Sequence, residues 1–240
     1  VGQRTSTMNI RSAMDNGKIL IVNLSRGLVG EDNASILGAL MVTKIQLAAM
    51  SRADIVNIDD RKPFYLYVDE FQNFATDSFA TILSEARKYA LNLTVANQYT
   101  SQMTPEVRDA VFGNVGGIIS FRVGAEDASA LTKYFEPQFE PQDLIQMHNR
   151  AFIASLSIDG EKTPAFSATT LNIPKNETNF TQAIIEHSRL RYAVPREEVE
   201  KTIAYDNAPK FKQGSPQGEQ KQNTSNKPQN NQKPSKSSSS

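Results

Sequence analysis

Residues 64–74, FYLYVDEFQNF, constrain the fold more than any other part of the sequence. A run of apolar and aromatic residues leads there directly into two acids, Asp69 and Glu70. A short, uninterrupted apolar run is typical of a strand that is buried on both faces of a parallel sheet. Pro63 stands just before the run, where its missing N–H is tolerated. The stretch therefore predicts a buried parallel strand with two carboxylates at its carboxyl end.

The position of the two acids predicts a binding site, because open α/β sheets bind their ligands at the carboxyl ends of the strands. In nucleoside triphosphatases this arrangement is the Walker B motif. Its first acid, here Asp69, holds the metal through the water shell, and its second, here Glu70, polarises the water that attacks the γ-phosphate. The alternative is a strand that ends in a solvated acidic turn, and the surrounding pattern has to decide between the two.

Strand and helix patterns alternate along the chain. Apolar runs predict strands at 18–24, 64–68, 91–96 and 117–123, and helical spacing predicts helices at 34–52, 79–90, 105–112 and 125–134. This alternation predicts an α/β fold, a parallel sheet flanked by helices with right-handed crossovers. Asp159-Gly160, between 151–158 and 163–171, predicts a terminal β-hairpin. Residues 180–204 hold two weaker helical patterns separated by Pro195.

The last part of the chain differs in composition from the rest. Residues 207–240 are rich in Gln, Asn, Ser, Lys and Pro, so we expect a disordered tail that cannot bury enough apolar surface to fold. The tail carries a net charge of +5 and the remaining residues −5, which gives the net charge of zero. A basic tail can contact nucleic acid or an anionic membrane, but we favour a solubilising terminus.

Several classes of site are excluded by composition and spacing. The chain has no cysteine, and His148 and His187 are isolated, so we expect neither disulfides nor a zinc site. No uninterrupted apolar run approaches the roughly 20 residues of a membrane span, and no signal peptide opens the chain. No G-x-x-x-x-G-K-[S/T] phosphate-binding loop is present, so this chain alone is not expected to bind nucleotide tightly.

Four further polar residues are candidates for a phosphate site. Asn97 and Gln98 follow the strand at 91–96, where an amide can contact the γ-phosphate and hold the attacking water. Arg87 lies on the preceding helix and can serve as an arginine finger toward a neighbouring subunit. Arg122 closes the strand at 117–123. The alternatives are a strand-end turn for the amides, a solvated helix face for Arg87, and an ion pair with Glu126 or Asp127 for Arg122.

Taken together, four blocks resemble one family of motors. GKILIVNLSRGLVGEDNASILGAL, FYLYVDEFQNFA, ILSEARKYALNLTVANQ and NVGGIISFRVGAEDA are similar, in order and spacing, to the carboxyl-terminal half of a HerA/FtsK-superfamily ATPase. Within that superfamily they most resemble the coupling proteins of conjugation and related ATPases of type IV secretion. The resemblance covers about residues 15–170. It is specific as a set, although no single block is.

The resemblance implies a RecA-like P-loop fold and a homo-hexameric ring that uses ATP and Mg²⁺ to translocate DNA. It implies that Asp69 coordinates the metal, that Glu70 is the catalytic base, that Gln98 is the sensor and that Arg87 is the finger that acts in trans. Arg122 matches a recurrent Phe-Arg strand end of the family, and we expect Arg122 and Asn97, the neighbour of Gln98, to contribute to nucleotide binding. The Walker A loop would lie upstream of Val1, so we expect this chain to be the carboxyl-terminal part of a longer protein.

The same resemblance sets the expected domains and surroundings. We expect part of the ATPase domain at 1–175, a peripheral helical extension at 176–206 and the tail at 207–240. The implied partners are DNA, a relaxase and type IV secretion components. The implied location is the cytoplasmic face of the inner membrane, with membrane helices in the missing amino-terminal region. Two alternatives stay open: an assembly ATPase that does not act on DNA, and a non-catalytic module that recruits substrate.

Overall fold

The structure is a computed structural model that describes residues 6–75 and 77–207. Contacts divide the described residues into two units: the larger ends at Ala193, and the other begins at Val194. Each unit is described by itself. The prediction of a disordered tail at 207–240 concerns residues that, apart from Asn207, lie outside the described ranges.

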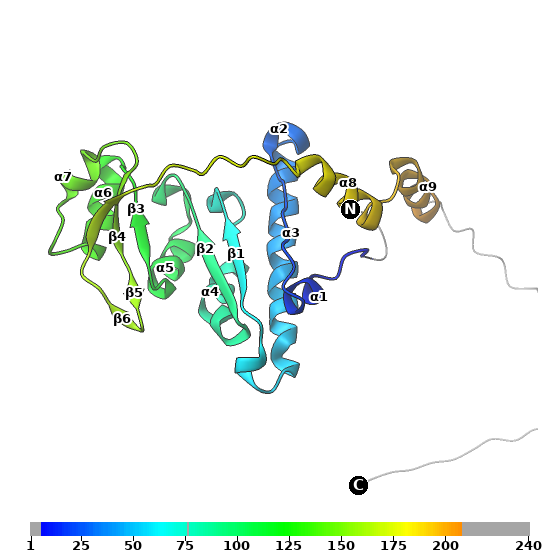
Figure 1. Cartoon of the computed structure of the whole chain (residues 1–240), viewed down its shortest axis with the longest axis horizontal. Helices are drawn as coiled ribbons and strands as arrows, with labels where there is room; N and C mark the ends of the chain where they lie inside the picture. The colour runs from blue at the N-terminus through cyan, green and yellow to red at the C-terminus, as the bar shows by residue number, and fades with distance from the viewer. Residues whose placement is uncertain (1–5, 76, 208–240) are drawn as a thin grey trace, which may run out of the picture. The chain divides into compact units, whose positions relative to one another are not determined.

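Two parallel strands carry the candidate site of the larger unit (Figure 1). β1 (Phe64–Val68) pairs with β2 (Leu91–Val95) in a register that runs from Phe64 opposite Leu91 to Val68 opposite Val95. The strands predicted at these two positions are therefore confirmed, and so is their parallel direction. The predicted larger parallel sheet is not formed, since this pair is a two-stranded sheet.

The side chains of β1 alternate between the core and solvent. Phe64, Leu66 and Val68 pack against the core, whereas Tyr65 and Tyr67 are 62% and 71% exposed. The prediction that this strand is buried on both faces is wrong, because Tyr65 and Tyr67 lie on the face that points away from the core. Tyrosine has an apolar ring and a polar hydroxyl, so an uninterrupted apolar run is compatible with a half-exposed strand.

The long helix α3 (Glu31–Met50) forms one wall of the core. Its buried residues recur every three or four positions, which is the spacing of one helix face: Ala34, Gly38, Val42, Ile45 and Ala49. Together with η1 (Ser51–Asp54) it forms the one stretch of the described residues that is long and apolar enough to cross a membrane. Polar and charged residues interrupt this stretch, so it is not among the uninterrupted apolar runs of the sequence. Core helices of soluble proteins meet the same criterion, so this composition alone places nothing in a membrane.

Two helices that flank β2 in the sequence complete this core. α4 (Asp77–Glu85) continues into η4 (Ala86–Tyr89), and α5 (Pro105–Asn114) begins at a Thr104 cap with proline in its first position. The rings of Phe71 and Phe79, both fully buried, lie 4.3 Å apart between centroids. This contact anchors the segment that follows Glu70 to the core.

A second apolar cluster surrounds an antiparallel sheet. β3 (Ile118–Ser120) pairs with β4 (Ala151–Ser155), and β4 pairs with β7 (Phe166–Thr169). The helices of this cluster are α6 (Ala125–Leu131), which continues into η6 (Thr132–Tyr134), and α7 (Pro141–Ile145). The strand predicted at 117–123 thus exists in shortened form, but its pairing is antiparallel. The hairpin predicted at Asp159-Gly160 is present, between β5 (Ser157–Ile158) and β6 (Glu161–Lys162).

The prediction of a buried strand at 18–24 is wrong. This segment follows α1 (Ile10–Asp15) without entering a sheet, and Ile19 and Ile21 are 92% and 76% exposed. A cavity of about 710 Å³ is lined by residues of this segment on one side and by β1 on the other, so no hydrogen-bonded ladder forms between them. The segment ends at a short helix, α2 (Arg26–Val29).

The remaining elements are short or peripheral. The 3₁₀ turns not yet named are η2 (Ile58–Asp60), η3 (Phe71–Asn73) and η5 (Thr100–Gln102). The two helices expected around Pro195 are confirmed as α8 (Thr181–Tyr192), in the larger unit, and α9 (Arg196–Asn207), in the other. Neither helix has a buried residue among those whose burial is described.

Candidate active site

The candidate site lies where β1 and β2 end. Asp69 and Glu70 follow β1, and Asn97 and Gln98 follow β2 after one intervening residue, Ala96. The parallel pairing continues beyond both strands: the Ala96 N–H donates to the Val68 carbonyl, and the Phe71 N–H donates to the Ala96 carbonyl, each at 2.9 Å. This ladder brings the acids and the amides to the same end of the sheet, as the sequence predicts.

The backbone of Glu70 is in a left-handed conformation, with φ 48° and ψ 44°. Such a conformation costs a non-glycine residue about 1–2 kcal/mol and is concentrated at functional sites. The Asp69 carboxylate accepts a hydrogen bond of 2.9 Å from the Glu70 N–H and so stabilises the sharp turn. Asp69 is exposed and Glu70 is half-buried, so both carboxylates are accessible to a ligand.

Two residues that the sequence analysis did not single out contact Glu70. The Asn73 side-chain amide donates to Glu70 Oε2 at 3.1 Å, and Arg26 Nη2 lies 3.8 Å from the same oxygen. Arg26 also donates to Asn73 Oδ1 and to Glu31 Oε1. The sequence gives little indication of either contact. Arg26, for example, stands beside a glycine, 44 residues before Glu70.

The amides and Arg122 line a second cavity, of about 670 Å³, that does not include the two acids. Asn97, Gln98 and Arg122 are all exposed, and Arg122 forms no ion pair within the described ranges. The alternative of an Arg122 ion pair with Glu126 or Asp127 is therefore not realised. Asp127 is buried and instead accepts hydrogen bonds from the backbone and hydroxyl of Thr100, which holds the segment after Gln98.

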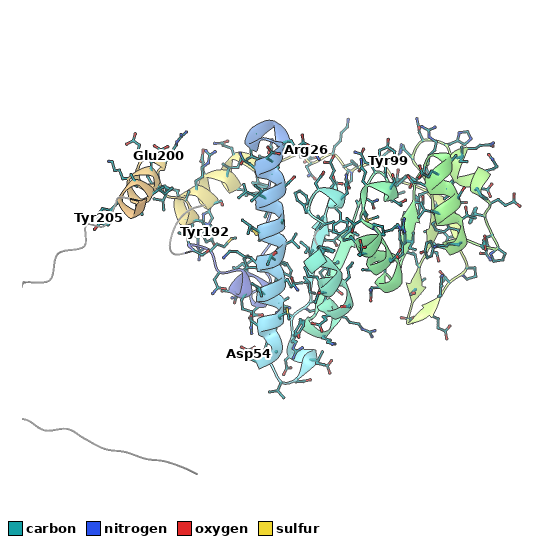
Figure 2. The ribbon with its side chains drawn as sticks, turned by 180° about the vertical axis from the view of Figure 1, so that it is seen from behind. Arg26, Asp54, Tyr99, Tyr192, Glu200 and Tyr205 are labelled. Atoms are coloured by element: carbon teal, nitrogen blue, oxygen red, sulfur yellow. The ribbon has the colours of Figure 1, made fainter. Side chains whose placement is uncertain are left out.

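Arg87 lies at the opposite end of β2. Its 3₁₀ turn, η4, precedes the strand, whereas Gln98 follows it, and a five-residue strand spans about 16 Å. Figure 2 shows the two ends: Arg26 and Tyr99 lie at one, and Asp54 lies at the other. The Arg87 side chain is exposed. The structure therefore does not bring Arg87 together with Asp69, Glu70 or Gln98 of the same chain.

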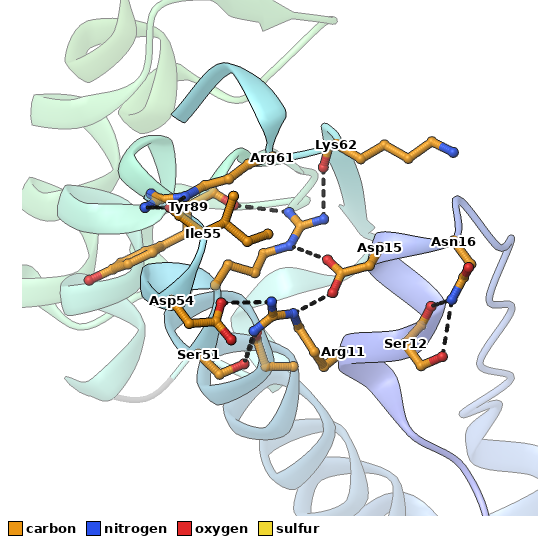
Figure 3. A network of polar contacts seen from close by, with 12 residues as sticks. Arg11, Ser12, Asp15, Asn16, Ser51, Asp54, Ile55, Arg61, Lys62 and Tyr89 are labelled. Carbon is orange, nitrogen blue, oxygen red and sulfur yellow. Dashed lines mark hydrogen bonds and ion pairs between the residues drawn. The ribbon is translucent and has the colours of Figure 1, made fainter. Parts of the chain in front are cut away.

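A buried arginine network fixes the backbone around Arg87 (Figure 3). Arg52, which is 0% exposed, donates to the Tyr89 carbonyl at 3.0 Å, to the Lys62 carbonyl at 2.8 Å and to Asp15 Oδ1 at 3.0 Å. Arg61 donates to the Lys88 carbonyl. The backbone carbonyls of Lys88 and Tyr89, the two residues after Arg87, are thus held by hydrogen bonds. The Arg87 side chain itself is exposed.

The same network sets the charge state of Asp15. Burial by itself would raise the pKa of the Asp15 carboxyl, but hydrogen bonds from Arg11 and Arg52 outweigh it and lower the pKa below its ordinary value. Hydrogen bonds to Asp54 and Asp15 raise the pKa of the Arg11 guanidinium further above its ordinary value. Asp15 is therefore ionised at neutral pH.

The donor set at the site suits one kind of metal ion. No group of three or more His, Cys, Asp or Glu in residues 6–75 and 77–207 is arranged to hold a metal. Mg²⁺, however, keeps several waters and is bound through one or two carboxylates together with substrate phosphates. Asp69 is exposed at a strand end and meets this requirement, so it is the residue that would hold Mg²⁺ with a bound nucleotide.

Comparison with known proteins adds no family assignment. No protein-family model matches the sequence, and no curated protein matches it. The likeness to HerA/FtsK-superfamily motors therefore stays a prediction based on the four sequence blocks.

Proposed function

We propose that this chain is part of an ATP-driven motor subunit that translocates DNA in conjugation or type IV secretion. The observation that carries the proposal is the position of four residues. Asp69 and Glu70 follow one of two adjacent parallel strands, and Asn97 and Gln98 follow the other, at the same end of the sheet. The hydrogen bond from the Asn73 amide to Glu70 Oε2 supports it, since this contact restrains a carboxylate at the end of β1.

The proposed reaction is hydrolysis of the β–γ phosphoanhydride of ATP. Glu70 accepts a proton from the attacking water, whose oxygen forms the new bond to the γ-phosphorus, and ADP leaves with the electrons of the broken bond. Gln98 and Asn97 donate hydrogen bonds to the γ-phosphate, and Arg122 neutralises phosphate charge. Asp69 would hold Mg²⁺, which would supply charge neutralisation to the phosphate groups.

The proposed site is incomplete in this chain, because the sequence has no phosphate-binding loop. In the described part of the chain, β2 pairs only with β1 and β3 only with β4, so each keeps a free edge. Residues of both strands line the cavity of about 670 Å³. Free strand edges can hydrogen-bond a further strand. We propose that residues outside this sequence supply such a strand and carry the phosphate-binding loop to Gln98 and Glu70.

Arg87 is proposed to complete the site of the next subunit in a ring. Its distance from Glu70 within one chain rules out a direct role there, and its exposed side chain on a fixed backbone suits a contact in trans. An arginine supplied from a neighbour stabilises the charge that develops in phosphoryl transfer. The proposed assembly is a homo-hexamer that passes DNA through its centre.

The test is the Glu70→Gln variant of the complete gene product. We expect it to bind ATP like the wild type and to release phosphate at least 100-fold more slowly, because the amide cannot accept the proton of the attacking water. Glu106→Gln, an exposed change in the first turn of α5, is the control and should retain full turnover. Turnover that persists in Glu70→Gln would exclude the proposed role of Glu70.

A second candidate function is an assembly ATPase that does not act on DNA. The net charge of −5 outside the tail favours it, because surfaces that coat DNA are basic. The same ATPase assay separates the two: stimulation by added DNA supports the translocating motor, and turnover that is indifferent to DNA supports the assembly ATPase.

A further inference from the structure

Asn73 lies between a guanidinium and a carboxylate. Its Nδ2 is 3.1 Å from Glu70 Oε2, and its Oδ1 accepts a hydrogen bond from Arg26 Nη2. Arg26 is held from its other side by Glu31 Oε1, 2.7 Å from Nη1. The contacts link α2 and the adjacent start of α3 to the segment after β1, which lies 47 residues from Arg26 in the sequence.

The chemistry of the two neighbours leaves one orientation for the Asn73 amide. Guanidinium groups only donate hydrogen bonds, and ionised carboxylates only accept them. The amide oxygen must therefore face Arg26, and the amide nitrogen must face Glu70. Arg26 thus decides which end of Asn73 meets the carboxylate, although its own Nη2 is 3.8 Å from Glu70 Oε2.

The backbone from Glu70 to Phe74 is held independently of the side chains of Arg26, Glu70 and Asn73. The Asn73 N–H donates to the Glu70 carbonyl at 3.0 Å, and the Phe74 N–H donates to the Phe71 carbonyl at 2.9 Å. The fully buried ring of Phe71 packs on Phe79. Asn73 is therefore a fixed point, whereas a half-exposed glutamate without a partner samples several rotamers.

We infer that Asn73 and Arg26 are positioning residues that hold the Glu70 carboxylate in the direction required of a general base. This inference rests on the proposed function and deepens it: Asn73 restrains Glu70 directly, and Arg26 acts through Asn73. Neither residue needs to touch the nucleotide, so the restraint should affect the rate of the chemical step and leave nucleotide binding unchanged.

The experiment measures kcat and KM for ATP in variants of the complete gene product. Asn73→Asp preserves the shape of the side chain, but it replaces the donor to Glu70 by an acceptor oxygen and adds a negative charge beside the Glu70 carboxylate. We expect kcat to fall at least tenfold while KM changes less than twofold. Arg26→Gln should lower kcat about threefold to tenfold. Arg26→Lys keeps the length, the positive charge and a donor for Asn73 Oδ1, whereas Arg26→Gln is shorter and uncharged, so Arg26→Lys should recover most of the activity.

Two control variants match these changes elsewhere on the surface. Asn114→Asp alters an exposed amide that bonds only a carbonyl of its own helix, and Arg108→Gln alters an exposed guanidinium paired with its neighbour in the sequence. Both should retain wild-type kcat. Wild-type kcat in Asn73→Asp, or a loss in Arg26→Lys as large as in Arg26→Gln, would overturn the inference.

The outcomes separate this inference from the proposed function. ATPase activity that depends on Glu70 but not on Asn73 refutes the positioning role alone. If the wild type has no ATPase activity at all, the proposed function fails and the positioning role fails with it. In that case the NMR signal of the Asn73 side-chain amide still shows whether the contact exists, because it should shift in both Glu70→Gln and Arg26→Gln.

Discussion

At the scale of single residues, Glu70 combines three features that a solvated turn does not require. Its backbone is left-handed, its N–H is bound by the preceding carboxylate, and its side chain is restrained by Asn73. Ala90, Arg150 and Asp159 adopt a positive φ as well, so the backbone conformation alone does not mark a site. The restraint of the Glu70 carboxylate by Asn73 is the feature that favours a requirement for the carboxylate over the alternative of an acidic turn.

The pH dependence of stability follows from Asp15. Its pKa is lowered in the folded protein, so its contribution is fully present above the ordinary carboxyl pKa and is lost as the pH falls through the lower, folded-state value. We expect Asp15→Asn to destabilise the protein by about 1–2 kcal/mol at pH 7, because Arg52 is buried and loses a charged partner. The difference from the wild type should begin to shrink as the pH falls toward the ordinary carboxyl pKa, and it should vanish only below the lowered pKa of the folded state.

Urea unfolding followed by circular dichroism at several pH values measures this difference. Asp109→Asn is the matched control, since its carboxylate is exposed and pairs only with the adjacent Arg108. It should change stability by less than about 0.5 kcal/mol at every pH. A destabilisation by Asp15→Asn that is equal at pH 7 and pH 3 would contradict the ion-pair explanation.

At the scale of elements, the sequence predicts local structure well and pairing poorly. The strands 64–68 and 91–95 and the site residues at their ends follow from apolar runs bounded by polar residues. Residues 18–24 have equal β propensity but form no strand, because propensity describes a side chain and a strand also needs a neighbouring backbone to bond. The direction of β3 and the exposure of Tyr65 and Tyr67 depend in the same way on which elements lie beside them.

The roles of Asn73 and Arg26 could not be predicted for a related reason. Both are polar residues in turns, where such residues are expected for local reasons. Their significance comes from a contact that spans 47 residues of sequence. Only the packing of α3 against the segment after β1 brings them together.

That packing depends on a glycine. A Cβ atom at Gly38 of α3 would overlap the edge of the Phe74 ring and come within 3.0 Å of its Cγ. Gly38→Ala should therefore destabilise the protein by about 1–3 kcal/mol, although alanine is otherwise the better helix former. The comparison is Gly113→Ala in α5, where nothing lies within 4 Å, and there we expect a stabilisation of up to about 1 kcal/mol.

Thermal unfolding of the two variants distinguishes these effects. Adding Phe74→Leu to Gly38→Ala should recover part of the lost stability, because the smaller side chain makes room for the methyl group. If Gly38→Ala were as stabilising as Gly113→Ala, the close packing of α3 on Phe74 would be wrong.

At the scale of the whole molecule, the candidate residues form an open half-site. Asp69 and Glu70 line one cavity, Asn97, Gln98 and Arg122 line another, and Arg87 lies at the far end of β2. The proposed ATPase site therefore needs three further parts. These are a phosphate-binding loop between the acids and the amides, a strand that pairs with the free edges of β2 and β3, and a site on a neighbouring subunit for Arg87. The proposed ring of complete subunits would supply all three.

The last prediction concerns ATP binding by this chain alone. Without a loop of backbone N–H groups and its lysine, the remaining contacts are exposed side chains, and each adds little in water. We expect a Kd for Mg-ATP above about 1 mM for residues 1–240, and a Kd in the micromolar range for the complete gene product, a difference of at least 4 kcal/mol. Isothermal titration calorimetry on both proteins measures it. Micromolar binding by residues 1–240 would show that these residues hold a complete nucleotide site, because no upstream loop would then be needed.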